Sequence, residues 1–163
     1  MDKILHHQTM SKKANADSIL IRNSTPEDLD EVFSLLQQLW PNRQLNKELF
    51  GKAFLNSFDI EGHIIRLACS GNEVIGLCAL SLRNNLYAQG TLANIDELVI
   101  DEKYRGKGIG KLMLDDVTSI ARDKNCPFLE LESAFHREDA HRFYEKEGFE
   151  KTGYFLSKKL KQQ

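Results

Sequence analysis

Six residues near the middle of the chain have the composition of an anion-binding loop. They read Arg105-Gly106-Lys107-Gly108-Ile109-Gly110, after an apolar run that ends at Ile100 and before apolar residues at helical spacing. A strand that turns through glycines into a helix exposes backbone N–H groups at the positive end of that helix. Glycines let the backbone approach an anion, and Arg105 and Lys107 add positive charge. The segment therefore predicts a site for a phosphate-bearing ligand.

The loop fits neither of the common nucleotide motifs. A P-loop has a glycine where this chain has Arg105, and the dinucleotide fingerprint has one where it has Lys111. The pattern instead resembles the R-G-x-G-[IV]-G signature of the GNAT superfamily of acetyl-CoA-dependent N-acetyltransferases. That resemblance implies acetyl-CoA as co-substrate, with its pyrophosphate on the loop and the backbone of Leu98, Val99 and Ile100 in the same site. A glycine-rich connection without a ligand is the alternative, but glycines for close approach favour a ligand.

A second motif lies nearer the C-terminus, from Ala140 to Phe149. It resembles the A-x-x-F-Y-x-x-x-G-F element of the same superfamily, which places a tyrosine beside the thioester sulfur. The resemblance makes Tyr144 the group that protonates the departing thiolate, since a hydroxyl with a pKa of about 10 stays protonated. A tyrosine that only packs with its polar end in water is the alternative. Arg137 occupies the position of a coenzyme-contacting asparagine in many members, so it joins the candidate coenzyme-binding residues with a different chemistry.

Acetyl transfer also needs a base, because an amine arrives mainly as an ammonium ion. Strand alternation places Glu97 on the same face as Val99 and puts Asp96 on the opposite face with Leu98. Many superfamily members carry a glutamate near Glu97, so Glu97 is the predicted base and Asp96 the second candidate. Alternatively, one of the two caps a loop or pairs with Arg105. A backbone N–H beside a bulge in the 98–100 segment is the candidate for stabilising the oxyanion.

The elements that must position these residues follow from periodicity and breakers. Helices are expected over 25–40, with Thr25 as N-cap and Pro26 in the first turn, and over 45–54, 109–125 and 138–147. Strands are expected over 18–23, 63–70, 73–82, 92–100 and 128–131, with one or two more in 149–160. This order is α/β (α+β) and matches the GNAT fold: a mixed sheet of six to seven strands flanked by four helices. The prediction is one N-acetyltransferase domain over 18–163 after a flexible tail over 1–17.

Bulk composition excludes several classes of function. With 163 residues, 41% hydrophobic content, 28% charged content and a formal net charge of −2, the chain has the composition of an ordinary soluble protein. It offers no electrostatic case for nucleic acid or an anionic membrane, and no apolar run predicts a membrane span or signal peptide. Cys69, Cys78 and Cys126 are odd in number and widely spaced, which indicates reduced, buried thiols in the cytoplasm. No metal site and no acyl-carrier thiol are predicted.

The acceptor is the least determined part of the prediction. The run from Arg137 to Tyr144, with Phe155 and Lys158-Lys159-Leu160, resembles bacterial aminoalkylphosphonate N-acetyltransferases, which implies a small primary amine with an acidic group. The acceptor pocket is expected near 40–44 and 83–90, where Arg43 and Arg83 either bind that group or are solvated. Two alternatives stay open: an acetyltransferase acting on protein lysines or N-termini, and a catalytically silent coenzyme A binding module. The resemblance is also compatible with a homodimer.

Overall fold

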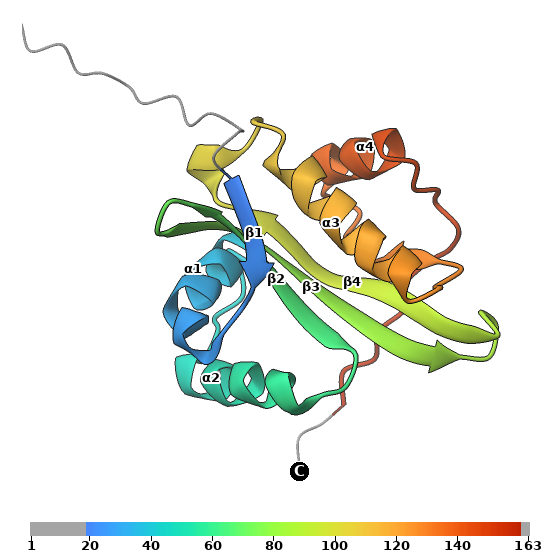
Figure 1. Ribbon diagram of the computed structural model, residues 1–163, viewed down its shortest axis with the longest axis horizontal. Helices are drawn as coiled ribbons and strands as arrows, with labels where there is room; N and C mark the ends of the chain where they lie inside the picture. The colour runs from blue at the N-terminus through green and yellow to red at the C-terminus, as the bar shows by residue number, and fades with distance from the viewer. Residues whose placement is uncertain (1–18, 161–163) are drawn as a thin grey trace, which may run out of the picture.

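The computed structural model describes residues 19–160, which form one mixed sheet with helices on both faces (Figure 1). The N-terminal tail expected over 1–17 lies outside these residues. The strands are β1 (Ile19–Asn23), β2 (His63–Ser70), β3 (Glu73–Asn85), β4 (Gly90–Ile100) and β5 (Leu129–Leu131). The α-helices are α1 (Leu29–Leu39), α2 (Lys47–Asn56), α3 (Ile109–Asp123) and α4 (Glu138–Lys146). Short 3-10 turns, η2 (Pro26–Asp28), η3 (Ser57–Asp59) and η4 (Glu102–Tyr104), join some of them.

The sheet has the order β1-β2-β3-β4-β5, and its first four strands are antiparallel. β4 and β5 are parallel and pair over only three positions, from Ala93 opposite Leu129 to Ile95 opposite Leu131. Beyond Ile95, β4 continues to Ile100 alongside β3 alone. The sheet therefore opens between β4 and β5 at the end that leads into the glycine loop.

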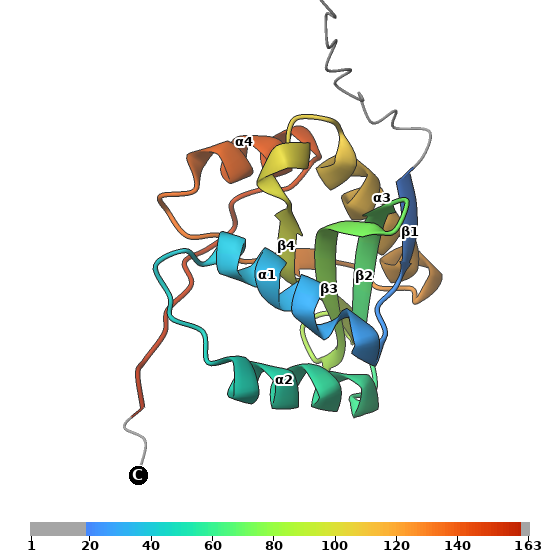
Figure 2. The ribbon, with the colours of Figure 1, turned by 90° about the vertical axis from the view of Figure 1, so that its left-hand side faces the viewer.

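Each face of the sheet carries its own core (Figure 2). On one face, α3 buries Met113 and Val117 against strand residues that include Cys78 and Leu80. On the other face, α1 and α2 pack over strand residues of a second cluster. Its buried members are Val32, Leu35, Leu36, Phe54, Leu67, Cys69, Leu77 and Val99. The amphipathic pattern of each helix thus faces the sheet, as the sequence predicts.

One glycine sets the distance between α3 and the sheet. A Cβ on Gly76 would lie 2.7 Å from Cδ1 of Ile100 and 3.0 Å from Sδ of Met113, closer than packing allows. A side chain at Gly76 of β3 would therefore push against both α3 and the end of β4. The composition of the strand did not indicate this, because the constraint comes from a helix that follows more than thirty residues later.

Thr25 is the N-cap of η2, the 3-10 turn that leads into α1, and α1 itself begins at Leu29 after Asp28. Thr25 precedes Pro26, and the amide and hydroxyl of Thr25 both donate to the Asp28 carboxylate. The Arg22 guanidinium makes two further bonds to Asp28, at 2.6 and 2.7 Å. This contact, more than the opposing effect of burial, lowers the pKa of Asp28 to about 2.

Two expectations about the sheet and the second helix were wrong. Residues 151–160 form no strand, so the described sheet has five strands and not six or seven. This segment is exposed throughout, including Tyr154, Phe155, Leu156 and Leu160. The second helix spans Lys47–Asn56, two residues later at each end than expected, and its Leu49 is 65% exposed. Within the described residues, no helix has both the length and the apolar character needed to cross a membrane.

Candidate active site

The glycine loop ends in a helix whose first amides are available. Gly106 and Gly108 have φ of 73° and 81°, a backbone region that favours glycine, and Gly108 is the N-cap of α3. The first bond of the helical ladder runs from the Leu112 N–H to the Gly108 carbonyl at 3.1 Å. The N–H groups of Ile109, Gly110 and Lys111 therefore have no carbonyl partner in the helix. Because the Ile109 side chain is buried and anchors the turn, the loop presents backbone and not apolar side chains to a ligand.

The two cations of the loop are held close to it. Arg105 Nε donates to the Ile100 carbonyl at 3.0 Å, and Lys107 Nζ donates to the Lys103 carbonyl at the same distance. Lys107 also lies 4.7 Å from the centre of the Tyr104 ring. Both side chains are on exposed residues, so they add positive potential around the loop without being buried in it.

The open edge of β4 adds further free backbone next to the loop. The Asp101 N–H bonds to Ile75 on β3, whereas the Ile100 carbonyl bonds to Arg105 and so points away from β3. Since peptide groups alternate in direction along a strand, Leu98 and Ile100 direct theirs to the open edge and Val99 directs its own to β3. Of the three strand residues expected at the coenzyme, two therefore offer backbone groups to a ligand.

A β-bulge in β4 brings two carboxylates together. The register with β3 pairs Ala79 with Glu97 and Leu80 with Ile95, which leaves Asp96 as the extra residue. Asp96 accepts hydrogen bonds from the Ser81 hydroxyl and from Asn94 Nδ2, the latter at 2.7 Å. Ser81 shares its face of β3 with Ala79, so Asp96 and Glu97 lie on the same face.

The alternation of side chains along the strand therefore predicted correctly that Glu97 shares a face with Val99. The prediction for Asp96 was wrong, because Asp96 lies on this same face and not on the opposite one with Leu98. Neither carboxylate has Arg105 as an ion-pair partner within residues 19–160. The bulge is located at Asp96, immediately before the 98–100 segment in which an oxyanion-stabilising amide was expected.

Glu97 has the proton affinity of a base that works near neutral pH. Its side chain is half-buried, and burial first, then the negative charge of Asp96, raises the pKa of Glu97 to about 7. The carboxylate therefore changes charge in the pH range in which a general base is most useful.

Tyr144 lies on α4 between two other aromatic rings. Its ring centre is 5.3 Å from that of Phe143 and 5.7 Å from that of Phe149. Burial first, and then the neighbouring Cys78 thiol, raise the pKa of Tyr144 to about 12, while Arg137 acts in the opposite direction. The hydroxyl is thus a donor at any pH at which the protein works. Phe143 packs against the α3-side core, as expected from the sequence.

Cys78 is the common neighbour of both candidate catalytic groups. It lies on β3 opposite Leu98, is fully buried, and contributes to the raised pKa of Tyr144. Burial and the charges of Asp116, Glu97 and Asp96 raise its own pKa, so the thiol stays protonated. Leu98, the strand partner of Cys78, directly follows Glu97 in β4.

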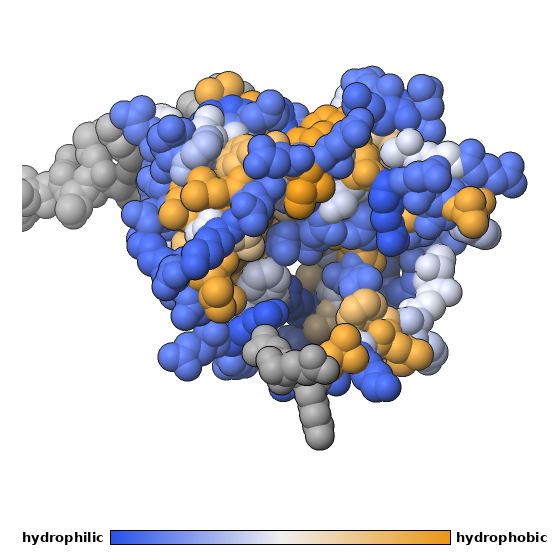
Figure 3. All heavy atoms as spheres, turned by 90° about the horizontal axis from the view of Figure 1, so that it is seen from below, coloured by the Kyte–Doolittle hydropathy of each residue, from blue (hydrophilic) through white to orange (hydrophobic). Residues whose placement is uncertain are grey.

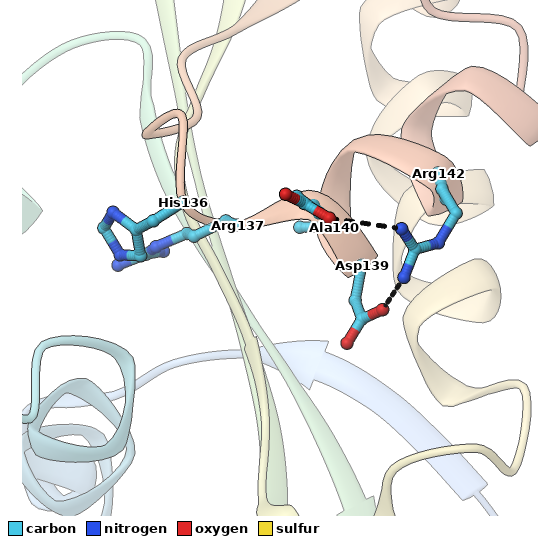
Figure 4. Close-up of a pocket in the computed structure, with 6 residues that line it drawn as sticks. His136, Arg137, Asp139, Ala140 and Arg142 are labelled. Atoms are coloured by element: carbon cyan, nitrogen blue, oxygen red, sulfur yellow. Dashed lines mark hydrogen bonds and ion pairs between the residues drawn. The ribbon is translucent and has the colours of Figure 1, made fainter.

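Arg137, which directly precedes α4, forms a hydrogen bond with the end of α1. Its guanidinium donates to the carbonyl of Leu39, the last residue of α1, at 2.8 Å. Arg137 also lines a pocket of about 480 Å³ at the start of α4. In Figure 4, Arg137 and His136 extend together away from the helix, while Asp139 and Arg142 form an ion pair beside it. The structure thus gives Arg137 a partner in the protein that the sequence did not indicate.

The expected acceptor region contains polar groups that the sequence did not single out. His63 Nε2 lies 4.0 Å from the Asp96 carboxylate, and its Nδ1 is buried without a partner among the described residues. His63, Ser81 and Asn94 come from three different strands, so only the strand register could have revealed this group. Seen from below, the molecule is hollowed near the middle of the face, with hydrophilic residues and separate apolar patches around the hollow (Figure 3).

The two arginines expected at the acceptor are both exposed. Arg43 lies 5.8 Å from the Trp40 ring in the turn after α1. Arg83 follows Ser81 by two residues on β3, so it shares the face that carries Glu97.

The three cysteines are free, and Cys69 and Cys78 are buried as expected, whereas Cys126 is only half-buried. Over residues 19–160, no group of three or more histidine, cysteine or acidic residues is arranged to hold a metal ion.

Comparison with known proteins identifies the family. The sequence model of the Acetyltransferase (GNAT) family matches residues 29–149. An aminoalkylphosphonate N-acetyltransferase of Salmonella typhimurium is 33% identical over 141 residues, which are 86% of this chain and 90% of that protein. An aminoglycoside N(6')-acetyltransferase of Stenotrophomonas maltophilia is 26% identical over 141 residues, with 84% and 90% covered.

A solved structure agrees with these sequence matches. The crystal structure of a transcriptional regulator from Bacillus halodurans superposes with a TM-score of 0.81 at 25% identity, covering 87% of this chain and 99% of that one. The fold expected from the sequence is thereby confirmed, apart from the number of strands. From the glycine loop, the open strand edge and these relatives together, the chain is a member of the GNAT acetyltransferase family and an acetyl-CoA-dependent N-acetyltransferase.

Proposed function

We propose that the protein transfers the acetyl group of acetyl-CoA directly to a primary amine of a small molecule, with both substrates bound together. The observation that carries this proposal is the opening of the sheet after Ile95, which leaves one edge of β4 unpaired next to Glu97. A linear, amide-containing ligand can pair with such an edge as an added strand does.

Coenzyme A fits the free backbone groups of this region. Its two pantetheine amides can bond to the peptide groups of Leu98 and Ile100, and its pyrophosphate to the amides at the start of α3. Arg105 and Lys107 then contribute charge, and Arg137 lies near Tyr144 at the thioester end. The peptide groups of Val99 contribute less to coenzyme binding, because they point to β3 and not to the open edge.

The chain supplies a group for each proton that must move. Glu97, as a carboxylate, takes a proton from the ammonium of the acceptor, and the free amine attacks the thioester carbonyl. A backbone N–H at the open edge, Leu98 or Ile100, stabilises the negative oxygen that develops. Tyr144 donates its proton to the thiolate as the carbon–sulfur bond breaks. Cys78 carries no acetyl group in this scheme, because its thiol is buried and its pKa is raised.

For the acceptor, we favour a small amine that bears an acidic group. The Salmonella relative is an aminoalkylphosphonate N-acetyltransferase, and this chain has exposed arginines in both regions in which the acceptor was expected. Arg83 lies on the face of Glu97, and Arg43 lies in the turn after α1, which Arg137 connects to the start of α4. An acceptor amine beside Glu97 would thus have a cation within reach for its anionic end. The proposal places the enzyme in the cytoplasm, with residues 18–163 as the catalytic domain and small molecules, not nucleic acid or membrane, as its partners.

The test is release of the coenzyme A thiol from acetyl-CoA in the presence of aminoalkylphosphonates, polyamines, aminoglycosides, amino acids or lysine peptides. We expect turnover with an acidic small amine, and a lower KM for it than for the same amine without its acidic group. Arg83→Gln and Arg43→Gln should remove that preference, while the exposed Arg122→Gln serves as the control. Exclusive turnover of lysine peptides would replace the small-molecule acceptor with a protein. Binding of acetyl-CoA without any turnover would support a silent binding module.

A further inference from the structure

Asp96 and Glu97 are adjacent carboxylates on one face, but their surroundings differ. The bulge makes Asp96 the unpaired residue of β4, and both of its oxygens are engaged. Ser81 donates to Oδ2 and Asn94 donates to Oδ1, and His63 Nε2 lies 4.0 Å from Oδ2. These two hydrogen bonds fix the Asp96 carboxylate in place beside Glu97.

Glu97 has no comparable support. Among the hydrogen bonds of residues 19–160, none ends on its carboxylate, and its cross-strand neighbour is Ala79, which has no polar side chain. Burial raises the pKa of Glu97 and the charge of Asp96 raises it further. Two carboxylates in one site with unlike surroundings divide acid and base roles between them.

The other ionisable groups around Glu97 do not compete with Asp96. Cys78 on β3 and Tyr144 on α4 have raised pKa values and remain neutral. Asp116 on α3 is paired with Arg66 of β2, and α1 contributes the neutral Gln38, which bonds to Asp101. Asp96 is the one charge that acts on the pKa of Glu97.

We infer that Asp96 is a positioning residue for the reaction: fixed beside Glu97 by its hydrogen bonds from Ser81 and Asn94, it makes Glu97 the group that takes the proton from the acceptor. Each oxygen of Asp96 already accepts one hydrogen bond, and Asp96 acts on the reaction through its charge. The inference rests on the proposed function in that the proton comes from an acceptor amine, but the coupling of the two carboxylates is a property of the free protein.

The coupling can be measured without substrates. Protein labelled with ¹³C at the glutamate carboxyl carbons is titrated by NMR, and the Glu97 signal is identified by its loss in Glu97→Gln. In Asp96→Asn, which keeps the shape of the side chain, the midpoint of Glu97 should fall by about one pH unit. Asp96→Glu restores the charge, so its midpoint should stay close to that of the wild type. The exposed Asp123→Asn is the matched control and should leave the midpoint unchanged.

The same variants give a kinetic readout with any acceptor that the panel identifies. In Asp96→Asn, the low-pH limb of kcat/KM should move to lower pH by the same amount as the NMR midpoint, and the plateau should fall because Glu97 is a weaker base. Two results would overturn the inference. One is a Glu97 midpoint that is equal in the wild type and in Asp96→Asn. The other is that the carboxylate titrating near pH 7 belongs to Asp96 and not to Glu97. If the midpoint shifts but no amine is acetylated, the inference stands and the proposed function fails. If amines are acetylated with one pH profile in both proteins, the proposed function stands and the inference fails.

Discussion

The glycine loop at 105–110 and the bulge at Asp96–Glu97 lie within fifteen residues of each other but are suited to different tasks. The loop presents backbone N–H groups, and its cations are on exposed residues. The bulge presents Glu97, whose pKa is raised by burial and by the charge of Asp96. Binding of an anion needs donors and charge in the right place, whereas proton transfer needs a group with a pKa matched to the working pH.

The comparison teaches which kind of site a local sequence pattern can reveal. Every part of the loop is contiguous in sequence: the glycines, the cations and the helix that follows. The bulge depends on partners from β2 and β3 that are far away in the chain. Four experiments test this difference, from the largest expected effect to the smallest.

Substitution of Glu97, the proposed base, should lower kcat/KM the most. Glu97→Gln is expected to lower kcat/KM by about 10²- to 10⁴-fold, because the acceptor then has no group to take its proton. In the wild type, kcat/KM should rise with pH through about 7 as Glu97 ionises, and this limb should be missing in the variant. Acetyl-CoA affinity, measured by calorimetry, should be unchanged, since the loop is intact. A variant whose pH–rate profile superimposes on that of the wild type would remove Glu97 from the mechanism.

Loss of the tyrosine hydroxyl should have the next largest effect. Tyr144→Phe is expected to lower kcat about 10²-fold with little change in either KM, because the ring still packs between Phe143 and Phe149. Tyr87→Phe, at an exposed hairpin position, is the control. A tenfold rise in the KM of acetyl-CoA with unchanged kcat would instead make Tyr144 a binding residue.

Substitution of a glycine in the loop should lower the affinity for acetyl-CoA and leave the chemical step unchanged. Gly108→Ala forces a side chain into a φ of 81°, so we expect the Kd of acetyl-CoA to rise roughly tenfold while the pH profile keeps its shape. Gly110→Ala is the matched control. Gly110 is helical, and its added Cβ would meet Phe143 at 3.6 Å, an ordinary contact. Equal losses of affinity in the two variants would show that the conformation of Gly108 is not what matters.

The smallest expected effect is on stability. The folded-state pKa of Glu97 lies above its unfolded value, so the native protein binds more protons between pH 4.5 and 7 and loses stability as pH rises through that range. Glu97→Gln removes this penalty. At pH 8 the variant should be more stable than the wild type by on the order of 2 kcal/mol, a difference that shrinks towards pH 5. Denaturant unfolding at both pH values measures it, and a variant less stable than the wild type at pH 8 would contradict the burial of the charge.

The sequence predicted much of this architecture, for identifiable reasons. The helix that starts at Thr25-Pro26 and the glycine-led start of α3 are encoded by neighbouring residues, and the structure has both. The one or two C-terminal strands expected over 149–160 are absent, because a strand forms only by pairing with another strand and the local sequence does not determine that pairing. Asp96 was assigned to the wrong face for a related reason, since a bulge is a property of two strands and not of one.

The sequence by itself determined the chemistry available to this protein: an anion-binding loop, a tyrosine that stays protonated and two adjacent carboxylates. Local patterns suffice there, because backbone geometry and side-chain type are fixed by residues close together in the chain. Only the tertiary structure decided that both carboxylates share a face, that Asp96 is already engaged by Ser81 and Asn94, and that Glu97 is left free with a pKa near 7. Burial and charge–charge interactions depend on distance in space, and a single strand read from the sequence does not contain those distances.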